Sequence, residues 1–392
     1  MRVTYVVLSP TFGMHQYAAD LANRFADPES YGEPLAHATV ITPRQVPADR
    51  YAPTVDVQSI ATVTGTGLKR SNLNPATFQQ VYRAILASQP DVVHFTGPHL
   101  WNPILLYRLR SRGIPTIHTI HDVDPHSGTG YGRLLYVWNN SIVRWAGQIL
   151  VHGQMYRDRL IAQGISPDRV VYTPLLHLFT SYEMEQRLRS AAPEISDQRY
   201  ALFFARLEAY KGVDVLLEAM QQLARSASTA RVIIAGKGDL SLVAPQATLP
   251  AAVELRNHLI GDTEAIDLFR QCSVVVLPYR DATQSALIAA AFFFQKPVIV
   301  TRAGALPEYV RDGETGWIIP PNDTAALSDC LRAAFADPAR LSQMGQAGRA
   351  WLELQSREEN QVLRRMYEQA GSHQALAAPT HQQAKKGDYA HD

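Results

Sequence analysis

Short apolar runs alternate with helical patterns along most of the chain, and this alternation constrains the fold more than any other feature. In the first half, apolar runs that predict strands cover residues 3–8, 39–41, 91–95, 115–120, 149–151 and 170–172. Most of them are separated by helical patterns, near 14–25, 75–87, 132–146 and 152–162. Runs that are apolar at successive positions are typical of parallel strands buried on both faces. The first half is therefore predicted to be a doubly wound α/β domain.

The second half of the chain repeats this pattern. Strands are predicted near 200–205, 231–235, 252–255, 273–277 and 297–301, with helices near 212–225, 263–271 and 284–294. A polar, charge-rich interval at 177–198 is the best candidate for a linker. We therefore predict two Rossmann-like α/β domains, 1–176 and 199–345, which face each other across a cleft.

The end of the chain has a different character. A helical pattern at about 343–369 predicts a C-terminal helix, assigned to 346–370, that could pack back on the first domain. The last residues, 372–392, contain few large apolar side chains and predict a disordered tail.

Composition excludes several classes of protein. Of 392 residues, 46% are hydrophobic and 19% are charged, as in a soluble globular protein. The net charge of +1 provides no field for nucleic acid, and two cysteines are too few for a disulfide framework or a Cys-rich zinc site. No apolar stretch approaches the roughly 20 residues of a membrane span, and the N-terminal apolar run is too short for a signal peptide. We expect a cytoplasmic protein that binds no nucleic acid.

Two cations follow one of the predicted strands. Residues 200–204 are apolar or aromatic, Arg206 follows two residues after them, and Lys211 with Gly212 opens an amphipathic helix. Open α/β sheets bind their ligands at the carboxyl ends of the strands. Two fixed positive charges beside a helix N-terminus suit a diphosphate. On this segment alone, a pair of solvated loop cations is an equally good interpretation.

Four segments of the chain match a known family. They are SPTFGMHQYAADLA (9–22), PTIHTIHD (115–122), FFARLEAYKGVDVLLEA (203–219) and QKPVIVTRAGALPEYVRDGETGWIIPPND (295–323). From its first strand to about residue 370, the chain resembles a family 4 glycosyltransferase of the GT-B fold and the glycosyltransferase group 1 type. The resemblance implies a retaining sugar transfer in the interdomain cleft. The donor would be a nucleotide-diphosphate sugar, used as co-substrate with no metal ion and no other cofactor.

The resemblance assigns roles to individual residues. Arg206 and Lys211 match the pair that binds the donor diphosphate, where preorganised cations lower the barrier to its departure. Gly13 matches a glycine that lets backbone amides approach the sugar phosphate; a plain turn glycine is the alternative. His121 matches the active-site histidine near the donor sugar. Among the other histidines, His94 and His118 lie within apolar runs and are interpreted as core residues.

One segment departs from the family pattern. Many members carry two glutamates seven residues apart before the strand at 297–301, and here those positions are Ala282 and Ala290. Asp281 lies next to the first and could substitute for it, whereas nothing replaces the second, which contacts the nucleotide ribose in the family. The helix that follows is apolar on all sides and is predicted to be buried. Three polar residues at its N-terminus are further candidates to hold phosphate or sugar hydroxyls: Thr283, Gln284 and Ser285.

Two other residues are donor-site candidates through the resemblance. Glu308, in GALPEYV, matches an acidic residue near the donor, with structural capping as the alternative. Gly236 opens a loop that lies near the nucleotide in the family. As a dinucleotide fingerprint this Gly236-Lys237-Gly238 motif is weak, because Ser241 stands where the third glycine is required.

A possible metal motif is set aside. Asp122 and Asp124 form the DxD of the other large glycosyltransferase fold. That fold is a single domain and lacks the pair formed by Arg206 and Lys211. We therefore predict no metal site.

The resemblance to GT-B enzymes implies that the acceptor faces the first domain. Aromatic side chains suited to stacking on sugars, or equally to packing in a core, are Trp101, His126, Tyr131 and Trp138. The segment 103–112 places Arg108 and Arg112 on one helical face, which is either a solvated face or a docking site for anionic lipid at the inner face of the cell membrane.

Together these features predict a retaining, metal-independent glycosyltransferase of the hexosyltransferase type. Its acceptor would be a glycan, a lipid-linked sugar or a small molecule, in polysaccharide or glycoconjugate biosynthesis. Two alternatives remain open. A sugar-nucleotide epimerase can share this double-domain fold but needs acidic residues where the chain has Ala282 and Ala290. A non-catalytic protein that binds nucleotide or glycan would be consistent with the missing second glutamate.

Overall fold

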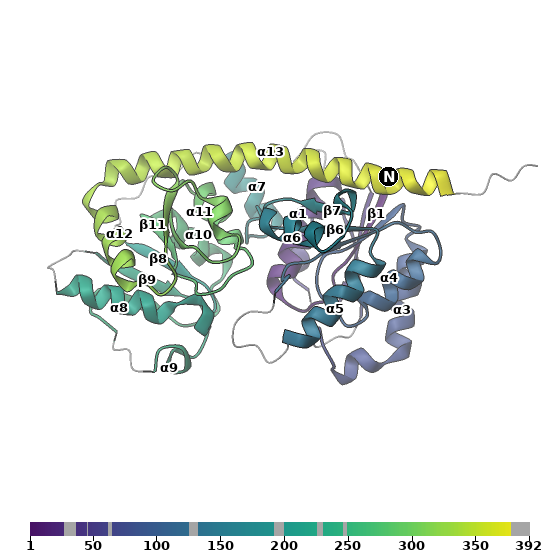
Figure 1. Cartoon of the computed structure of the whole chain (residues 1–392), viewed down its shortest axis with the longest axis horizontal. Coiled ribbons are helices and arrows are strands. Elements are labelled where there is room, and N and C mark those ends of the chain that lie inside the picture. The colour runs from purple at the N-terminus through teal and green to yellow at the C-terminus, as the bar shows by residue number, and fades with distance from the viewer. Residues whose placement is uncertain are drawn as a thin grey trace, which may run out of the picture.

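The computed structural model describes residues 1–26, 37–44, 46–61, 65–124, 132–191, 200–225, 230–245 and 249–377. It contains two parallel β-sheets, one in each half of the chain, with helices between their strands. The two halves lie side by side, and one long helix runs across both (Figure 1). The prediction of two doubly wound α/β domains is confirmed.

The first sheet has seven strands in the order β3-β2-β1-β4-β5-β6-β7. Their bounds are β1 (Arg2–Val6), β2 (His37–Pro43), β3 (Asp56–Ala61), β4 (Val92–Phe95), β5 (Thr116–Thr119), β6 (Gln148–Val151) and β7 (Val170–Tyr172). All of these strands pair in parallel. The strand order reverses between β1 and β4, which creates a crevice at their carboxyl ends.

Successive side chains of β1 enter two separate cores, because they point to opposite faces of the sheet. Val3 and Tyr5 pack with helix α1 (Phe12–Ala26). Val6 packs on the other face. That face is covered by α3 (Pro75–Ala87), α4 (Asn102–Arg110) and α5 (Gly132–Trp145). The first half ends with α6 (Gln154–Ala162), the short 3₁₀ helix η3 (Pro167–Arg169) and β7.

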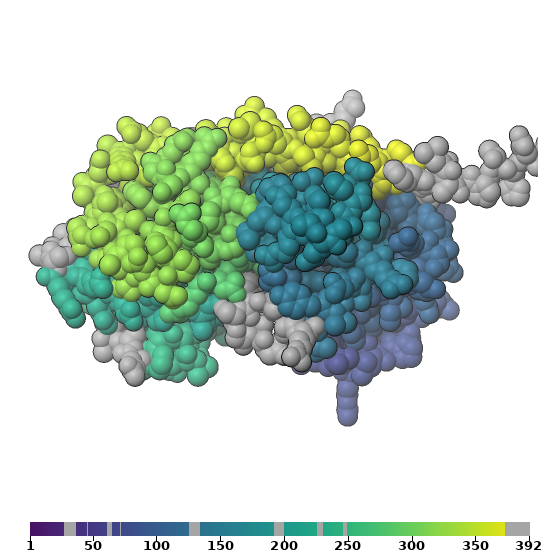
Figure 2. All heavy atoms as spheres, viewed as in Figure 1, coloured from purple at the N-terminus to yellow at the C-terminus, as the bar shows by residue number. Residues whose placement is uncertain are grey.

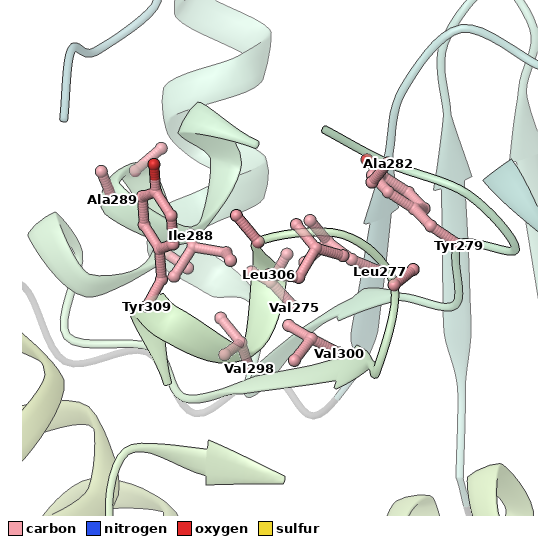
Figure 3. Close-up of a cluster of buried hydrophobic side chains, with 14 of the residues drawn as sticks. Val275, Leu277, Tyr279, Ala282, Ile288, Ala289, Val298, Val300, Leu306 and Tyr309 are labelled. Atoms are coloured by element: carbon pink, nitrogen blue, oxygen red, sulfur yellow. The ribbon is translucent and has the colours of Figure 1, made fainter. Parts of the chain in front are cut away.

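The second sheet has six parallel strands in the order β10-β9-β8-β11-β12-β13. The strands are β8 (Ala201–Phe204), β9 (Val232–Ala235), β10 (Val253–Arg256), β11 (Val274–Leu277), β12 (Val298–Thr301) and β13 (Gly316–Ile319). The helices between and after them are α8 (Val213–Ala224), α9 (Leu240–Val243), α10 (Asp262–Gln271), α11 (Ala286–Phe293) and α12 (Thr324–Ala336). Figure 3 shows Val275 and Val298 of this sheet beside Ile288 of α11, in the core that holds this helix in place.

The segment predicted as a linker contains a helix, α7 (Tyr182–Ser190). Its N-terminal neighbours are tied to both domains. Asp262, at the start of α10, accepts hydrogen bonds from the backbone N–H of Ser181 at 2.9 Å and from the guanidinium of Arg50 in the first domain at 2.6 and 2.9 Å. Arg50 also donates to the carbonyl of Phe179 at 2.9 Å. The segment predicted as a linker is therefore an ordered part of the interface between the domains.

The C-terminal helix α13 (Pro338–Ala377) is 40 residues long and exceeds the predicted 346–370 at both ends. Figure 2 shows it running over both halves of the molecule. Its first part packs on α11 and α12, and four residues of its second part join the core of the first sheet: Leu363, Met366, Tyr367 and Ala370. The helix also occupies 372–377, the start of the predicted disordered tail, which is a correction. The rest of that tail, 378–392, lies outside the described residues.

No helix in the described part of the chain has both the length and the apolar content needed to cross a membrane.

Candidate functional site

A cavity of about 550 Å³ opens between the two domains. The first domain lines it with the loop after β1 and the residues that follow β5. The second domain contributes the residues after β8 and the loop before α11. These segments all follow the carboxyl ends of central strands, where doubly wound sheets bind ligands. The cavity therefore joins the crevices of both sheets.

Arg206 and Lys211 lie on the second-domain wall of this cavity. The Arg206 side chain is 70% exposed, and its Nη1 lies 2.8 Å from Oε1 of Glu208. Lys211 ends the 3₁₀ helix η4 (Ala209–Lys211), and its Nζ lies 4.0 Å from the ring centroid of Tyr279. A cation over the face of an aromatic ring is attracted by the ring quadrupole. The two cations predicted from the sequence are thus brought together, and Tyr279 helps to fix one of them.

Gly212 permits this placement of Lys211. Its φ is +69°, in the left-handed region, and a Cβ on it would lie 2.0 Å from the carbonyl oxygen of Pro278. Only a glycine fits a backbone that combines this conformation with so close an approach. The turn thus packs against Pro278, the residue that follows β11. Lys211, the residue before Gly212, lines the cavity.

His121 lies on the opposite wall, directly after β5, and is buried. Its Nε2 lies 2.9 Å from the carbonyl oxygen of Thr96. A carbonyl can only accept, so Nε2 carries the proton and Nδ1 has the lone pair. Burial lowers the pKa of His121, which keeps the imidazole neutral at pH 7. His121 thus faces the two cations across the cavity as a neutral ring.

No sequence pattern pointed to the residues that surround His121. His177 also lines the cavity, although it falls in the predicted linker. Burial lowers its pKa, and its Nδ1 lies 2.9 Å from the carbonyl oxygen of Leu178. Tyr17, from α1, packs edge-on against His121 and His152 with ring centroids 4.9 and 5.1 Å apart. These aromatic contacts help to fix the orientation of the His121 ring.

Other predicted site residues also line the cavity. Gly13, in the first turn of α1, does so, and a Cβ on it would meet nothing within 4 Å, which leaves room for a ligand there. Thr283, Gln284 and Ser285 line it at the start of α11. Trp138 lines it from α5.

Three predicted donor contacts are absent from the described cavity lining: Gly236, Asp281 and Glu308. Gly236 has φ +145°, and a Cβ on it would lie 1.9 Å from the carbonyl oxygen of Ala205, so close packing explains the glycine. The Glu308 carboxylate accepts the backbone N–H groups of Gln154 and Met155 at 2.6 and 3.0 Å. It therefore caps α6 of the other domain, which supports the capping interpretation. Contact of these residues with a donor stays a prediction.

Two aromatic acceptor candidates lie outside the described residues, His126 and Tyr131. Trp101 is buried, and its Nε1 donates to the carbonyl of Asn72 at 2.6 Å. It is a core residue, as the alternative interpretation had it.

The alanines that replace the family glutamates differ in position. Ala282 lines the cavity, whereas Ala290 is 1% exposed within α11. The prediction that this helix is buried is confirmed, because six of its eight residues are buried. The core interpretation of His94 and His118 is also confirmed, since both are fully enclosed.

The two aspartates of the DxD motif have different surroundings. Asp122 lines the cavity. Asp124 forms an ion pair with Arg159 and accepts a hydrogen bond from the hydroxyl of Tyr136 at 3.3 Å. In the described ranges, no three or more His, Cys, Asp or Glu side chains are grouped so that they could hold a metal ion.

Two family models match the chain. The "Glycosyl transferase 4-like domain" matches residues 12–175, and "Glycosyl transferases group 1" matches residues 198–337, so that together they cover most of the sequence. The chain belongs to the group 1 glycosyltransferases, of family 4 type. The predicted enzyme class, glycosyltransferase, is confirmed.

Curated relatives of this glycosyltransferase include D-inositol 3-phosphate glycosyltransferases. D-inositol 3-phosphate glycosyltransferase of Gordonia bronchialis is 25% identical over 375 residues, covering 87% of this chain and 80% of the relative. The protein of the same name from Streptomyces scabiei is 26% identical over 373 residues, covering 87% of this chain and 82% of the relative.

Solved structures of the GT-B type share the fold. Sucrose-phosphate synthase from Thermosynechococcus elongatus superposes with a TM-score of 0.71 at 17% identity, covering 94% of this glycosyltransferase and 100% of that chain. Anabaena Alr3699/HepE in complex with UDP-glucose gives 0.66 at 16% identity, with the same coverage. The predicted GT-B fold is confirmed.

Proposed function

We propose that this glycosyltransferase moves a hexose from a nucleotide-diphosphate donor to an acceptor hydroxyl, with retention of configuration and without a metal ion. One observation carries the proposal. Arg206 and Lys211 share a 550 Å³ interdomain cavity with the neutral imidazole of His121. Retention follows from the resemblance to family 4 enzymes, and the configuration of the product's anomeric carbon, determined by proton NMR, tests it.

The cations act on the leaving group. When the bond between the anomeric carbon and the donor oxygen breaks, its electron pair goes to the diphosphate, whose negative charge grows. Arg206 and Lys211 are fixed at the end of β8 and just before α8, so they neutralise that charge with little reorganisation. The N-terminus of α8 adds a partial positive charge on the same side.

The donor's chemical class is inferred from the site and from a structural neighbour. The Anabaena protein was solved with UDP and with UDP-glucose bound. Here a nucleoside diphosphate would place its phosphates on the two cations and its sugar toward His121. The Nδ1 of this histidine can accept a hydrogen bond from a sugar hydroxyl, because Nε2 is already committed to Thr96.

The acceptor would approach from the first domain. Its wall of the cavity includes Leu135 and Trp138 of α5 together with Ile120. An apolar and aromatic wall suits one face of a sugar ring. We therefore propose a glycan, a lipid-linked sugar or a small molecule as the acceptor, in polysaccharide or glycoconjugate assembly.

Metal independence predicts that turnover is unchanged in excess chelator. The physical reason is that two fixed cations already face the diphosphate, while Asp124 is engaged by Arg159. The measurement is release of nucleoside diphosphate with chelator, with added manganese and with neither. Activity that chelator abolishes and manganese restores would move the chemistry to Asp122 and Asp124.

A non-catalytic binding protein is the second candidate, because Ala290 leaves the ribose without its family carboxylate. This substitution predicts that a deoxyribose nucleoside diphosphate binds within about tenfold of the ribose form, a difference below about 1.4 kcal/mol. Isothermal titration calorimetry of both nucleotides measures it. A larger difference would mean that another group holds the ribose. Detection of the glycosylated product would show that the protein is an enzyme and not a non-catalytic binding protein.

A further inference from the structure

Exposed apolar side chains gather on one part of the first domain. Thirteen large hydrophobic side chains are exposed in the described part of the chain, and seven of them fall between residues 68 and 137. They are Leu68, Leu73, Ile104, Tyr107, Leu134, Tyr136 and Val137. We call the surface formed by these residues and the cations among them the basic apolar face.

The helices that carry this face are packed against one another. Figure 1 shows α3, α4 and α5 grouped on one side of the first domain. The rings of Tyr107 on α4 and Trp145 on α5 lie 4.9 Å apart, and Arg110 donates to the carbonyl of Arg144 at 3.2 Å. On α4, Ile104 and Tyr107 are three residues apart, and on α5 Leu134 and Val137 are also three apart, so each pair lies on one side of its helix. The helices thus present their apolar residues from one connected unit.

Positive charge is concentrated on the same segments. Residues 65–137, which carry the face, contain seven cations: Lys69, Arg70, Arg83, Arg108, Arg110, Arg112 and Arg133. Their three acidic residues are Asp91, which accepts from the backbone N–H of Arg2 at 2.8 Å, Asp122, and Asp124, which pairs with Arg159. Helix α5 contains no acidic residue. Since the whole chain has a net charge of only +1, this is a strong local excess.

For the described residues, the structure shows which of these cations are free of contacts with aromatic rings and which are not. Arg108 lies over the rings of Phe78 and Tyr82, and Arg112 lies over Tyr82. The two arginines picked out by the sequence pattern are therefore partly engaged by α3. Other exposed cations lie just before or on η2 (Arg70–Leu73), on α3 and on α4: Lys69, Arg70, Arg83 and Arg110.

This face borders the mouth of the candidate active site. On α5, Leu135 and Trp138 line the cavity, while their neighbours Leu134 and Val137 are each 65% exposed. In the loop before η2, Thr66 lines the cavity and Leu68, two residues later, is exposed. A flat surface that covered the face would therefore lie next to the entrance on the acceptor side.

We propose that the basic apolar face docks on the surface of a membrane that contains anionic lipid and brings a lipid-linked acceptor to the mouth of the cavity. The acceptor part of this inference rests on the proposed function. Apolar side chains would enter the boundary between headgroups and acyl chains, and the two tyrosines suit the headgroup level. The arginines would contact lipid phosphates, and each basic residue near an anionic surface strengthens binding by about fivefold.

The test is flotation of the full chain with vesicles of zwitterionic lipid, with and without anionic lipid. Leu134→Asp/Val137→Asp is compared with Leu242→Asp/Leu259→Asp, which alters two exposed leucines of the second domain. Arg83→Glu is compared with Arg225→Glu at the end of α8, which is also exposed. We expect binding to anionic vesicles, about tenfold weaker binding for the first variant of each pair, and wild-type binding for the controls.

Other outcomes overturn the proposal. They are failure to bind anionic vesicles, binding by Leu134→Asp/Val137→Asp equal to wild type, or self-association in sedimentation that this variant abolishes, which would assign the face to a second copy. Melting curves and thermal shift with nucleoside diphosphate check folding and the donor site in every variant. Vesicle binding without nucleotide binding would refute the proposed function while leaving the docking surface intact.

Discussion

Lys211→Ala is expected to lower turnover by about two to three orders of magnitude while leaving the melting temperature near that of the wild type. A cation aimed at charge that develops in the transition state contributes roughly 3–4 kcal/mol, which corresponds to this loss. The lysine ends η4 on the cavity wall and rests on the face of Tyr279, so its removal leaves the surrounding core unchanged. The measurement is the rate of nucleoside diphosphate release at saturating donor.

The matched control is Arg225→Ala, which removes an exposed cation at the other end of α8 and should leave turnover unchanged. Arg206→Ala should act like Lys211→Ala. The double variant should lose less than the sum of the two, because both cations serve one charge. Near-normal turnover of Lys211→Ala would refute the donor site proposed above.

Most of the architecture could be predicted from the apolar runs, because parallel strands covered on both faces leave that pattern in the sequence. Two strands were missed, both at sheet edges. In β3, DVQSIA, polar and apolar residues are mixed because the strand is partly exposed. In β13, GWII, the strand is short and begins with Gly316. A Cβ there would lie 2.2 Å from the carbonyl oxygen of Val298, which explains the glycine.

The site was partly predictable for a related reason. Arg206 and His121 each lie two residues after the end of a strand, and the carboxyl ends of parallel strands meet at one edge of each sheet. Other residues are placed by the way the two domains meet, and their positions cannot be predicted from a nearby strand end. Glu308 caps a helix of the other domain, and His177 reaches the cavity from the linker. Neither contact has a local sequence pattern, because each needs both domains in place.

A series of buried hydrogen bonds connects the C-terminal helix α13 to the residues that line the cavity, and no sequence pattern predicts it. The Tyr367 hydroxyl lies 2.7 Å from Nδ1 of His94, whose Nε2 lies 2.8 Å from Oγ1 of Thr119. The same Oγ1 lies 3.2 Å from the hydroxyl of Tyr17, whose ring packs on His121. Helix α13 therefore supports the wall of the cavity as well as joining the domains.

The ion pairs that fasten α13 to the first domain are buried. Nη1 of Arg24 lies 2.6 Å from Oε2 of Glu359, and Nη2 lies 2.6 Å from Oδ2 of Asp20. All three side chains are at most 6% exposed. One guanidinium therefore lies between two buried carboxyl groups, one from α1 and one from α13.

Arg24→Met is expected to lower the free energy of unfolding by roughly 3–5 kcal/mol, because it leaves Asp20 and Glu359 buried without a cation. Urea unfolding measures the loss. Glu359→Gln should cost less, since Arg24 keeps Asp20. Arg187→Met, which breaks only an exposed pair with Glu183, should change stability by less than about 0.5 kcal/mol.

The loss in Arg24→Met should also depend on pH. Burial raises the pKa of Glu359 to about 7 even beside Arg24, and removal of the arginine should raise it further. The folded chain then holds a proton that the unfolded chain releases near pH 4.5, so stability falls as pH rises from about 4.5 through the folded pKa. We therefore expect a larger loss at about pH 8 than at about pH 5. An equal loss at both values, or a loss as small as that of Arg187→Met, would mean that this ion pair does not anchor α13.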